Sequence, residues 1–85
     1  MKHLSQVISI ATAHSPDKVA LFFEREEITY RDLDIRSNQM AQRLVREGVK
    51  PGMQVGICME RSIEMVVGLL GVLKAGAAYI PLDPA

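Results

Sequence analysis

The apolar positions at the start of the chain have the spacing of one face of a helix. They are Leu4, Val7, Ile8 and Ala11, at i, i+3, i+4 and i+7. This spacing predicts an amphipathic helix from about His3 to Ala13, and it favours that helix over a secretion signal. The helix should end before Pro16, because the residue that precedes a proline is disfavoured in helical geometry.

Two apolar runs separated by charged residues follow, and together they predict a β-hairpin. Val19–Phe23 contains β-branched and aromatic residues, which are enriched in strands. Glu24–Glu27 is charged and would form the turn, so that the chain returns through Ile28. We interpret the glutamates of this segment as a solvated hairpin tip rather than as an acidic site.

A second helix is marked at both ends. Thr29 is a suitable N-cap, and Asp32 lies three residues on, where its carboxylate can reach back to the Thr29 amide. Gly48 should end the helix, and Pro51 prevents it from resuming. The expected buried stripe comprises Leu33, Ser37, Met40, Ala41 and Leu44.

The second half of the chain reads as strand, helix and strand. Gln54–Met59 predicts a strand, in which Gly56 suggests close approach by another backbone. Ser62 can cap a following helix. From Met65 to Leu73 that helix is apolar nearly all round, so it must be covered on more than one side. Because the crossover is a helix, the two flanking strands should be parallel.

The last residues end the helix and enter the second strand. Gly76 fits a left-handed C-cap, and Lys74 lies in the last turn, where a cation faces the negative end of the helix dipole. Tyr79, Ile80 and Leu82 read as strand, which Pro81 and Pro84 should end. A strand that has just entered a sheet is a poor place for a domain to finish. We therefore expect residues 1–85 to be an incomplete piece of a larger layered α/β domain.

Charge and composition narrow the function without identifying it. Ten basic and ten acidic side chains cancel, which argues against a nucleic-acid or anionic-membrane surface. Cys58 is the only cysteine, so no internal disulfide is possible and a reducing, cytoplasmic location is expected. The apolar run Met65–Leu73 is far shorter than the ~20 residues of a membrane span.

Single residues and short motifs offer little chemistry. The segment Gly71–Gly76 has two glycines of a phosphate-binding loop, but it ends a helix instead of starting one. His3, His14 and Cys58 lack metal-ligand spacing. We expect Cys58 to be a packed core thiol, His14 a solvated loop residue and Tyr30 a packing residue.

The strongest candidate for a site is Glu60-Arg61-Ser62. It follows a strand that is expected to be parallel, at the edge where open α/β sheets tend to hold ligands. A helix cap with a surface ion pair is the interpretation that we favour. No stretch supplies nucleophile, base and anion site together, so we expect no catalytic, cofactor-binding or metal-binding residue in this chain.

Three segments together resemble the start of the adenylate-forming enzymes, specifically the amino-acid adenylation domains of nonribosomal peptide synthetases. Ile28–Leu33 (ITYRDL) is similar to the first core motif of that family. Gly48–Gly52 with the strand at Val55–Cys58 is similar to the region that follows. Leu73–Pro84 (LKAGAAYIPLDP) matches the second core motif almost residue for residue. Gln54 is a departure, since the family commonly has an acidic residue before this strand.

This resemblance implies an ATP-dependent, AMP-forming ligase. A carboxylate substrate attacks ATP, with magnesium, to give an acyl-adenylate and pyrophosphate, and the acyl group then passes to the phosphopantetheine thiol of a carrier protein. The family's phosphate loop, ribose aspartate, catalytic lysine and substrate pocket lie beyond its second core motif. The resemblance therefore assigns no functional residue here.

Three hypotheses remain open at this point. The chain is the N-terminal part of an adenylation domain and is inactive alone; or it is a non-catalytic module that docks onto a separately encoded remainder; or it is a truncated product that associates with itself. Unpaired sheet edges and apolar patches commonly mark association sites, so the second and third hypotheses use the same surfaces.

Overall fold

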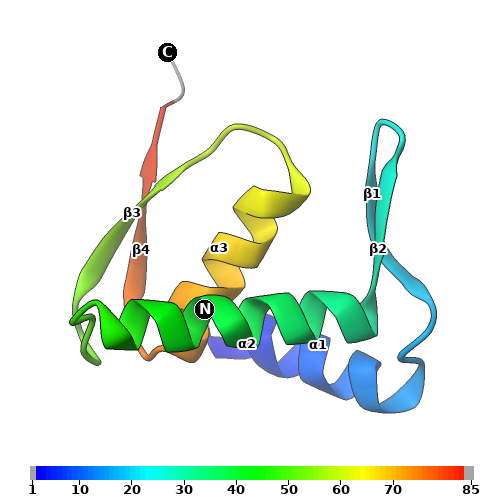
Figure 1. Ribbon diagram of the computed structural model, residues 1–85, viewed down its shortest axis with the longest axis horizontal. Helices are drawn as coiled ribbons and strands as arrows, with labels where there is room; N and C mark the ends of the chain where they lie inside the picture. Colours follow the sequence, from blue (N-terminus) through cyan, green and yellow to red (C-terminus); the bar gives the residue numbers. More distant parts are fainter. Residues whose placement is uncertain (1, 84–85) are drawn as a thin grey trace.

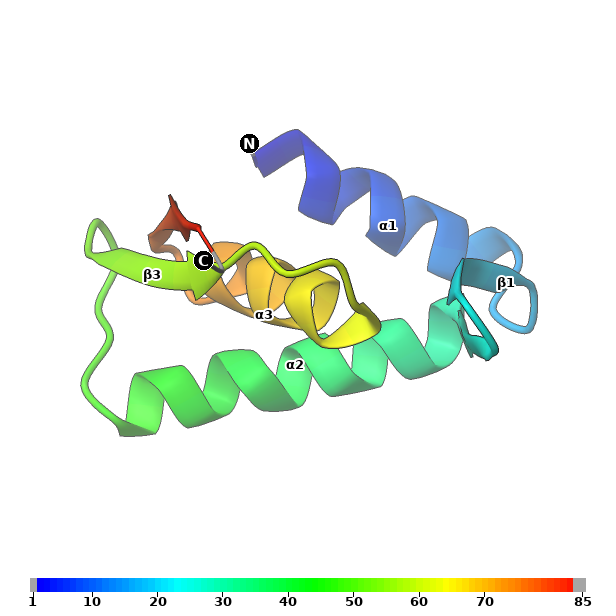
Figure 2. The same cartoon turned by 90° about the horizontal axis from the view of Figure 1, so that it is seen from above.

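The helix α3 lies at the centre of the fold and contacts every other helix and strand. The computed structural model describes residues 2–83. In chain order the elements are α1 (Lys2–His14), β1 (Val19–Phe23), β2 (Glu26–Thr29), α2 (Tyr30–Arg46), β3 (Gln54–Cys58), α3 (Ile63–Lys74) and β4 (Ala78–Leu82). Figure 2 shows α3 between α1 and α2, and Figure 1 shows the hairpin β1–β2 at one end of the molecule and the β3–β4 pair at the other.

The hydrophobic core forms where α3 meets α2 and the hairpin. Its buried members are Ile28, Leu33, Ile63, Val67 and Leu70, and Ile8, Ala20, Leu21, Met40 and Val66 pack against them. The expectation that α3 is covered on more than one side is confirmed. In α1 only part of the predicted apolar face is used, because Ile8 packs against the core whereas Leu4 and Val7 are exposed.

The predicted hairpin is confirmed, and its turn is tighter than expected. The strands β1 and β2 are antiparallel, and Phe23 pairs with Glu26. Glu24 therefore lies in the turn, with a left-handed φ of 57°. This conformation is uncommon for a residue with a side chain. Asn-Gly and Asp-Gly are the usual sequence markers of such a turn, and neither is present here. The sequence therefore predicted the hairpin without fixing the position of its turn.

The helix caps follow the sequence closely. The Asp32 amide donates to Thr29 Oγ1 at 3.2 Å, and the Met65 amide donates to Ser62 Oγ at 3.0 Å. The reciprocal bond from the Thr29 amide to the Asp32 carboxylate is not formed within residues 2–83. At the other ends, Gly48 and Gly76 have φ values of 102° and 80°, as a left-handed C-cap requires.

The helices α2 and α3 both end in Schellman motifs. In α2 the Val49 amide donates to the Leu44 carbonyl at 2.9 Å, and in α3 the Ala77 amide donates to the Val72 carbonyl at 3.1 Å. These bonds satisfy carbonyls that would otherwise end the helices without partners. They also turn the chain sharply after α3, so that it enters β4.

The strands β3 and β4 are parallel, as predicted, with Gln54 opposite Ala78 and Cys58 opposite Leu82. Two details of the prediction are wrong. Pro81 does not end the second strand but lies within it, opposite Ile57. The group that approaches Gly56 is a side chain and not a backbone, because a Cβ at Gly56 would lie 2.8 Å from Leu82 Cδ1. Pro84, the other expected end marker, lies outside the described residues.

Gly71 lies at a close contact between α2 and α3. This glycine is buried, and a Cβ built there would collide with Met40 Cγ and lie 2.8 Å from Met40 Cβ. By contrast, a Cβ at Gly68 would lie 3.6 Å from Ile57 Cδ1, which is ordinary van der Waals contact. Both glycines lie within α3, but an added Cβ would clash with Met40 at Gly71 and would fit at Gly68.

We expect the substitutions Gly71→Ala and Gly68→Ala to change stability in opposite directions. Alanine at 71 overpacks the α2–α3 contact and should lower the free energy of unfolding by about 1–3 kcal/mol. Alanine at 68 should raise it by up to about 1 kcal/mol, because it removes the entropic cost of a helical glycine. Urea unfolding followed by circular dichroism measures both. Equal stabilisation by the two substitutions would contradict the close contact at Gly71.

Candidate functional site

The most highly organised polar cluster of the molecule surrounds Lys74, at the end of α3. Its ammonium group donates to Asp34 Oδ1 at 2.9 Å, to Ser37 Oγ at 2.7 Å and to Asn38 Oδ1 at 2.8 Å. The three acceptors follow one another at helical spacing on α2, so they share one face. The Lys74 side chain is 13% exposed and that of Asp34 is 32% exposed.

Lys74 lies in the last turn of α3, as predicted, and it also makes a contact that its position in the sequence does not predict. Its charged group crosses to α2, whose acceptors lie 36 to 40 residues earlier in the sequence. One signal in the sequence could have revealed this contact. Ser37 occupies the predicted apolar stripe of α2, and it is fully buried. A buried hydroxyl in such a stripe requires a polar partner from another element.

The cluster is suited to holding two helices together rather than to catalysis. All three side-chain acceptors face the ammonium group, and no buried side-chain nitrogen or oxygen of the described residues lacks a hydrogen-bond partner. A group that abstracts a proton from a substrate, or donates one to it, must be within hydrogen-bond reach of that substrate. Lys74 instead connects the end of α3 to the middle of α2.

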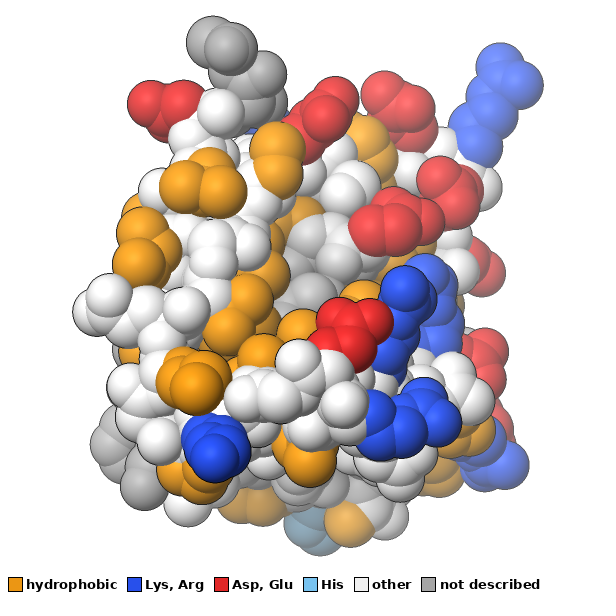
Figure 3. All heavy atoms as spheres, turned by 60° about the vertical axis from the view of Figure 1, so that its left-hand side comes forward, with side chains coloured by type: hydrophobic (Ala, Val, Ile, Leu, Met, Phe, Trp, Pro, Cys, Tyr) orange, Lys and Arg blue, Asp and Glu red, His pale blue; other side chains and the backbone are white. Residues whose placement is uncertain are grey.

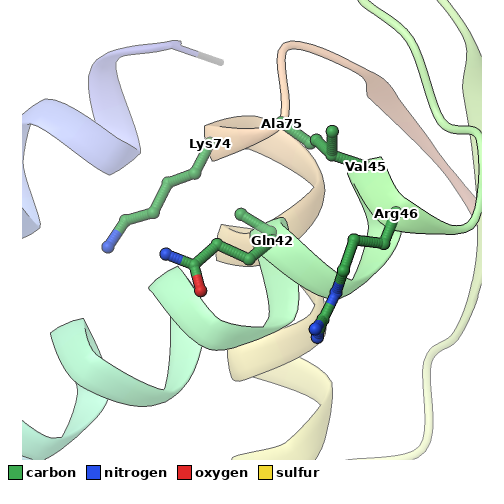
Figure 4. Close-up of a pocket in the computed structure, with 6 residues that line it drawn as sticks. Gln42, Val45, Arg46, Lys74 and Ala75 are labelled. Carbon is green, nitrogen blue, oxygen red and sulfur yellow. The ribbon is translucent and has the colours of Figure 1, made fainter.

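A shallow groove of about 520 Å³ lies where α2 and α3 end, next to the Lys74 cluster. Ala41, Val45 and Ala75 supply its apolar lining, and Gln42, Arg46 and Lys74 border it. Figure 4 shows Lys74 and Arg46 extending in different directions, so their charged groups do not converge on one point. The groove therefore lacks the convergent polar groups of a small-molecule site.

The segment Glu60-Arg61-Ser62 lies at the carboxyl end of β3, as expected. Ser62 caps α3, which confirms one half of the favoured interpretation. The other half is wrong, because the ion pairs of residues 2–83 include none between Glu60 and Arg61, both of which are exposed. The ion pair nearest to this cap joins Glu64 and Arg36 at 4.0 Å, which is a weak surface contact.

Cys58 is exposed, which corrects the expectation of a packed core thiol. In β3 the half-buried residues Val55 and Ile57 alternate with exposed Gln54, Gly56 and Cys58. The Ile57 side chain faces Gly68 of α3, so α3 covers only this face of the strand. In the sequence, all five residues of Val55–Met59 are of types that favour burial, so the sequence does not indicate which face of the strand is covered.

The remaining candidates are placed largely as expected. His14 is exposed, but it is the last residue of α1 and not a loop residue, and Tyr30 is half-buried at the start of α2. Glu24, Glu26 and Glu27 are all exposed at the hairpin. Within residues 2–83 no group of three or more His, Cys, Asp or Glu side chains could hold a metal ion. The described carboxylate, imidazole and thiol side chains therefore do not gather at one point.

No helix among the described residues combines the length and apolar character needed to cross a lipid bilayer.

The geometry defines a mixed α/β unit of three helices, an antiparallel hairpin and a parallel strand pair among the described residues. Known proteins place this unit in a family, because the model described as "AMP-binding enzyme" matches residues 9–85. The chain therefore belongs to the AMP-binding enzyme family. It is 52% identical over 84 residues to bacitracin synthase 3 of Bacillus licheniformis, a match that covers 99% of this chain and 1% of that protein.

Solved structures agree with this assignment. The nonribosomal peptide synthetase FmoA3 matches with a TM-score of 0.91 and 32% identity, over 96% of this chain and 9% of that one. An artificially fused adenylation–PCP di-domain, NpsA–ThdA from Klebsiella oxytoca, matches with a TM-score of 0.88 and 31% identity, over 94% of this chain and 15% of that one. The chain thus has the fold of part of an adenylation domain, and it spans a small part of each relative's length.

We expect Lys74→Met to destabilise the protein by about 1–3 kcal/mol, because it leaves partly buried oxygen acceptors without a donor. The matched control is Arg43→Met, which removes the exposed ion pair with Glu47 and should cost at most ~1 kcal/mol. Urea unfolding of the two variants measures the difference. Equal effects would show that the Lys74 cluster contributes no more than a surface pair.

Cys58 should react with a thiol reagent such as DTNB in the folded protein. We expect complete reaction of the single thiol, at a rate that denaturant changes less than about tenfold, since no unfolding is needed to expose it. Cys58→Ala is the control and should give no reaction. A rate that rises by orders of magnitude in denaturant would place Cys58 in the core after all.

Proposed function

We propose that residues 1–85 are the N-terminal part of an amino-acid adenylation domain. The observation that carries this proposal is the match of residues 9–85 to the AMP-binding enzyme family, together with relatives that include a bacitracin synthase and a nonribosomal peptide synthetase. The complete domain would activate the carboxylate of an amino acid with ATP and magnesium, giving an aminoacyl-adenylate and pyrophosphate. It would then transfer the aminoacyl group to the phosphopantetheine thiol of a carrier protein.

The role of this chain in that reaction is structural. The polar groups of the Lys74 cluster are occupied by contacts between α2 and α3. Its described acidic and histidine side chains do not converge into a metal site. These observations support a chain that is inactive alone and that contributes the first helices and strands of the domain. The NpsA–ThdA fusion joins an adenylation domain to a PCP, which supports a carrier protein as the partner of the complete enzyme.

A second candidate is a complementing module that docks onto a separately encoded remainder of the domain. It is favoured by the surface of β3 and β4 that faces away from α3. Ile80 and Leu82 are 40% and 49% exposed there, and parallel sheets are normally covered on both faces. In either case we propose a cytoplasmic location, on the basis of a single free cysteine and a reaction that uses ATP.

Activity measurements separate these possibilities. We expect the isolated 85-residue chain to give no ATP-dependent pyrophosphate exchange above a blank with any amino acid, because the family's nucleotide-binding motifs lie beyond its second core motif, which Leu73–Pro84 matches. Co-expression with the rest of an adenylation domain should restore exchange. The rest of the homologous domain from bacitracin synthase 3 is a suitable complement. Exchange by the chain alone would overturn the structural role, and no activity in the mixture would argue against complementation.

A further inference from the structure

Two exposed surfaces of this molecule are complementary in charge and in apolar character. The hairpin end consists of Phe22, Glu24, Glu26 and Glu27. The α2 groove is lined by Arg36, Gln39, Met40, Arg43 and Val67. We propose that the hairpin end of one copy of this chain binds the α2 groove of a second copy. The inference concerns the chain by itself, so it goes beyond the proposed function and does not rest on it.

The hairpin end presents an aromatic ring beside carboxylates. Phe22 is the most exposed of the large hydrophobic side chains among residues 2–83, at 79%. It lies opposite Glu27 in the antiparallel ladder, so the two side chains share one face of the hairpin. The other face carries Leu21 and Ile28, which pack in the core. Three glutamates and one arginine give Glu24–Glu27 a net charge of −2, and all four residues are exposed.

The α2 groove has an apolar lining with arginines on one side. Its volume is about 230 Å³. Pockets that bind small molecules begin at ~300 Å³, so this groove is suited to a single side chain of a partner. Met40 is half-buried and Val67 is buried. Arg36 and Arg43 lie two helical turns apart on the same face of α2, with side chains 45% and 69% exposed.

The two arginines have only weak partners within the chain. Arg36 lies 4.0 Å from Glu64, and Arg43 lies 3.4 Å from Glu47. Exposed pairs of this kind contribute at most ~1 kcal/mol, so the guanidinium groups can bind the carboxylates of another molecule with little loss. A guanidinium group can also stack on an aromatic ring. The groove therefore offers an apolar contact for Phe22 and cations for the glutamates beside it.

A second copy is the partner that the placement of these surfaces favours. Figure 1 shows the hairpin extending away from α2, so the hairpin end cannot reach the groove of its own chain. In Figure 3 acidic side chains predominate in the upper part of the view, and Lys and Arg in the lower part. Each copy thus carries both halves of the contact. Because the two halves differ, the contact is head to tail and continues into a ring or an open chain.

Sedimentation velocity of the purified chain over a range of protein concentrations tests this inference. We expect the average sedimentation coefficient to rise with concentration and to fall when salt is added, because exposed ion pairs are screened. Phe22→Ser removes the aromatic ring and should weaken association by about tenfold or more. Its matched control is Ile10→Ser, which removes an apolar side chain that is 61% exposed on α1 and should leave association unchanged.

Arg43→Glu tests the other surface. It places a negative charge against the glutamates of the hairpin end, so it should also weaken association by about tenfold or more. Arg31→Glu reverses another exposed charge, in the first turn of α2 and outside the groove, and is the matched control. Circular dichroism of each variant verifies that it is folded.

A mixture of the two variants gives the sharpest measurement. The Phe22→Ser chain keeps an intact groove, and the Arg43→Glu chain keeps an intact hairpin end. Together they should form a dimer of one copy of each, which cannot grow further. With ¹⁵N in one chain at a time, we expect amide shifts at Phe22–Glu27 of the Arg43→Glu chain and at Arg36–Met40 of the Phe22→Ser chain.

Several outcomes would overturn the inference. These are an unmodified chain that stays monomeric at every concentration, a mixture of the variants that forms no dimer, or amide shifts that map to α1 or to the β3–β4 pair. Equal loss of association in Ile10→Ser would show non-specific apolar contact instead. Pyrophosphate exchange with the bacitracin synthase complement reports separately on the proposed function, so failure of that assay leaves the head-to-tail contact standing.

Discussion

The arrangement of this protein depends on the burial of one helix that is apolar on nearly every side. Such a helix gains little from a single contact and must be enclosed from several directions. α3 is accordingly contacted by α1, by α2, by the hairpin and by the β3–β4 pair. Leu70 and Val72, which lie on different faces of α3, are both fully buried. The positions of the other elements follow from this requirement.

Gly71 permits a close contact between α3 and α2. Without a Cβ at this position, the Met40 side chain reaches the backbone of α3 and the two helices pack tightly. The same approach brings the polar face of α2 within reach of Lys74, whose ammonium group binds Asp34, Ser37 and Asn38. A glycine that appears only to weaken the helix thus makes the principal helix–helix contact and its polar cluster possible. This coupling explains why Ser37 can be fully buried without an unsatisfied hydroxyl.

Local sequence signals predicted most of the fold. The caps at Thr29 and Ser62 and the stops at Gly48 and Gly76 are each set by a few neighbouring residues, and all four were predicted. The candidate site was harder to predict from the sequence, because Lys74 binds acceptors that are distant in sequence. The exposure of Cys58 was missed for a related reason. A short apolar strand reads as buried on both faces, and only the position of α3 determines that one face is covered.

The second core motif, Leu73–Pro84, most clearly resembles the family, and three of its residues have structural roles. Lys74 joins two helices, Gly76 ends α3 with a left-handed residue, and Pro81 removes an amide donor from β4. None of these contacts needs a nucleotide. Family membership can therefore be established from a segment whose contacts are structural, because these contacts set the path of the chain out of α3 and into the sheet.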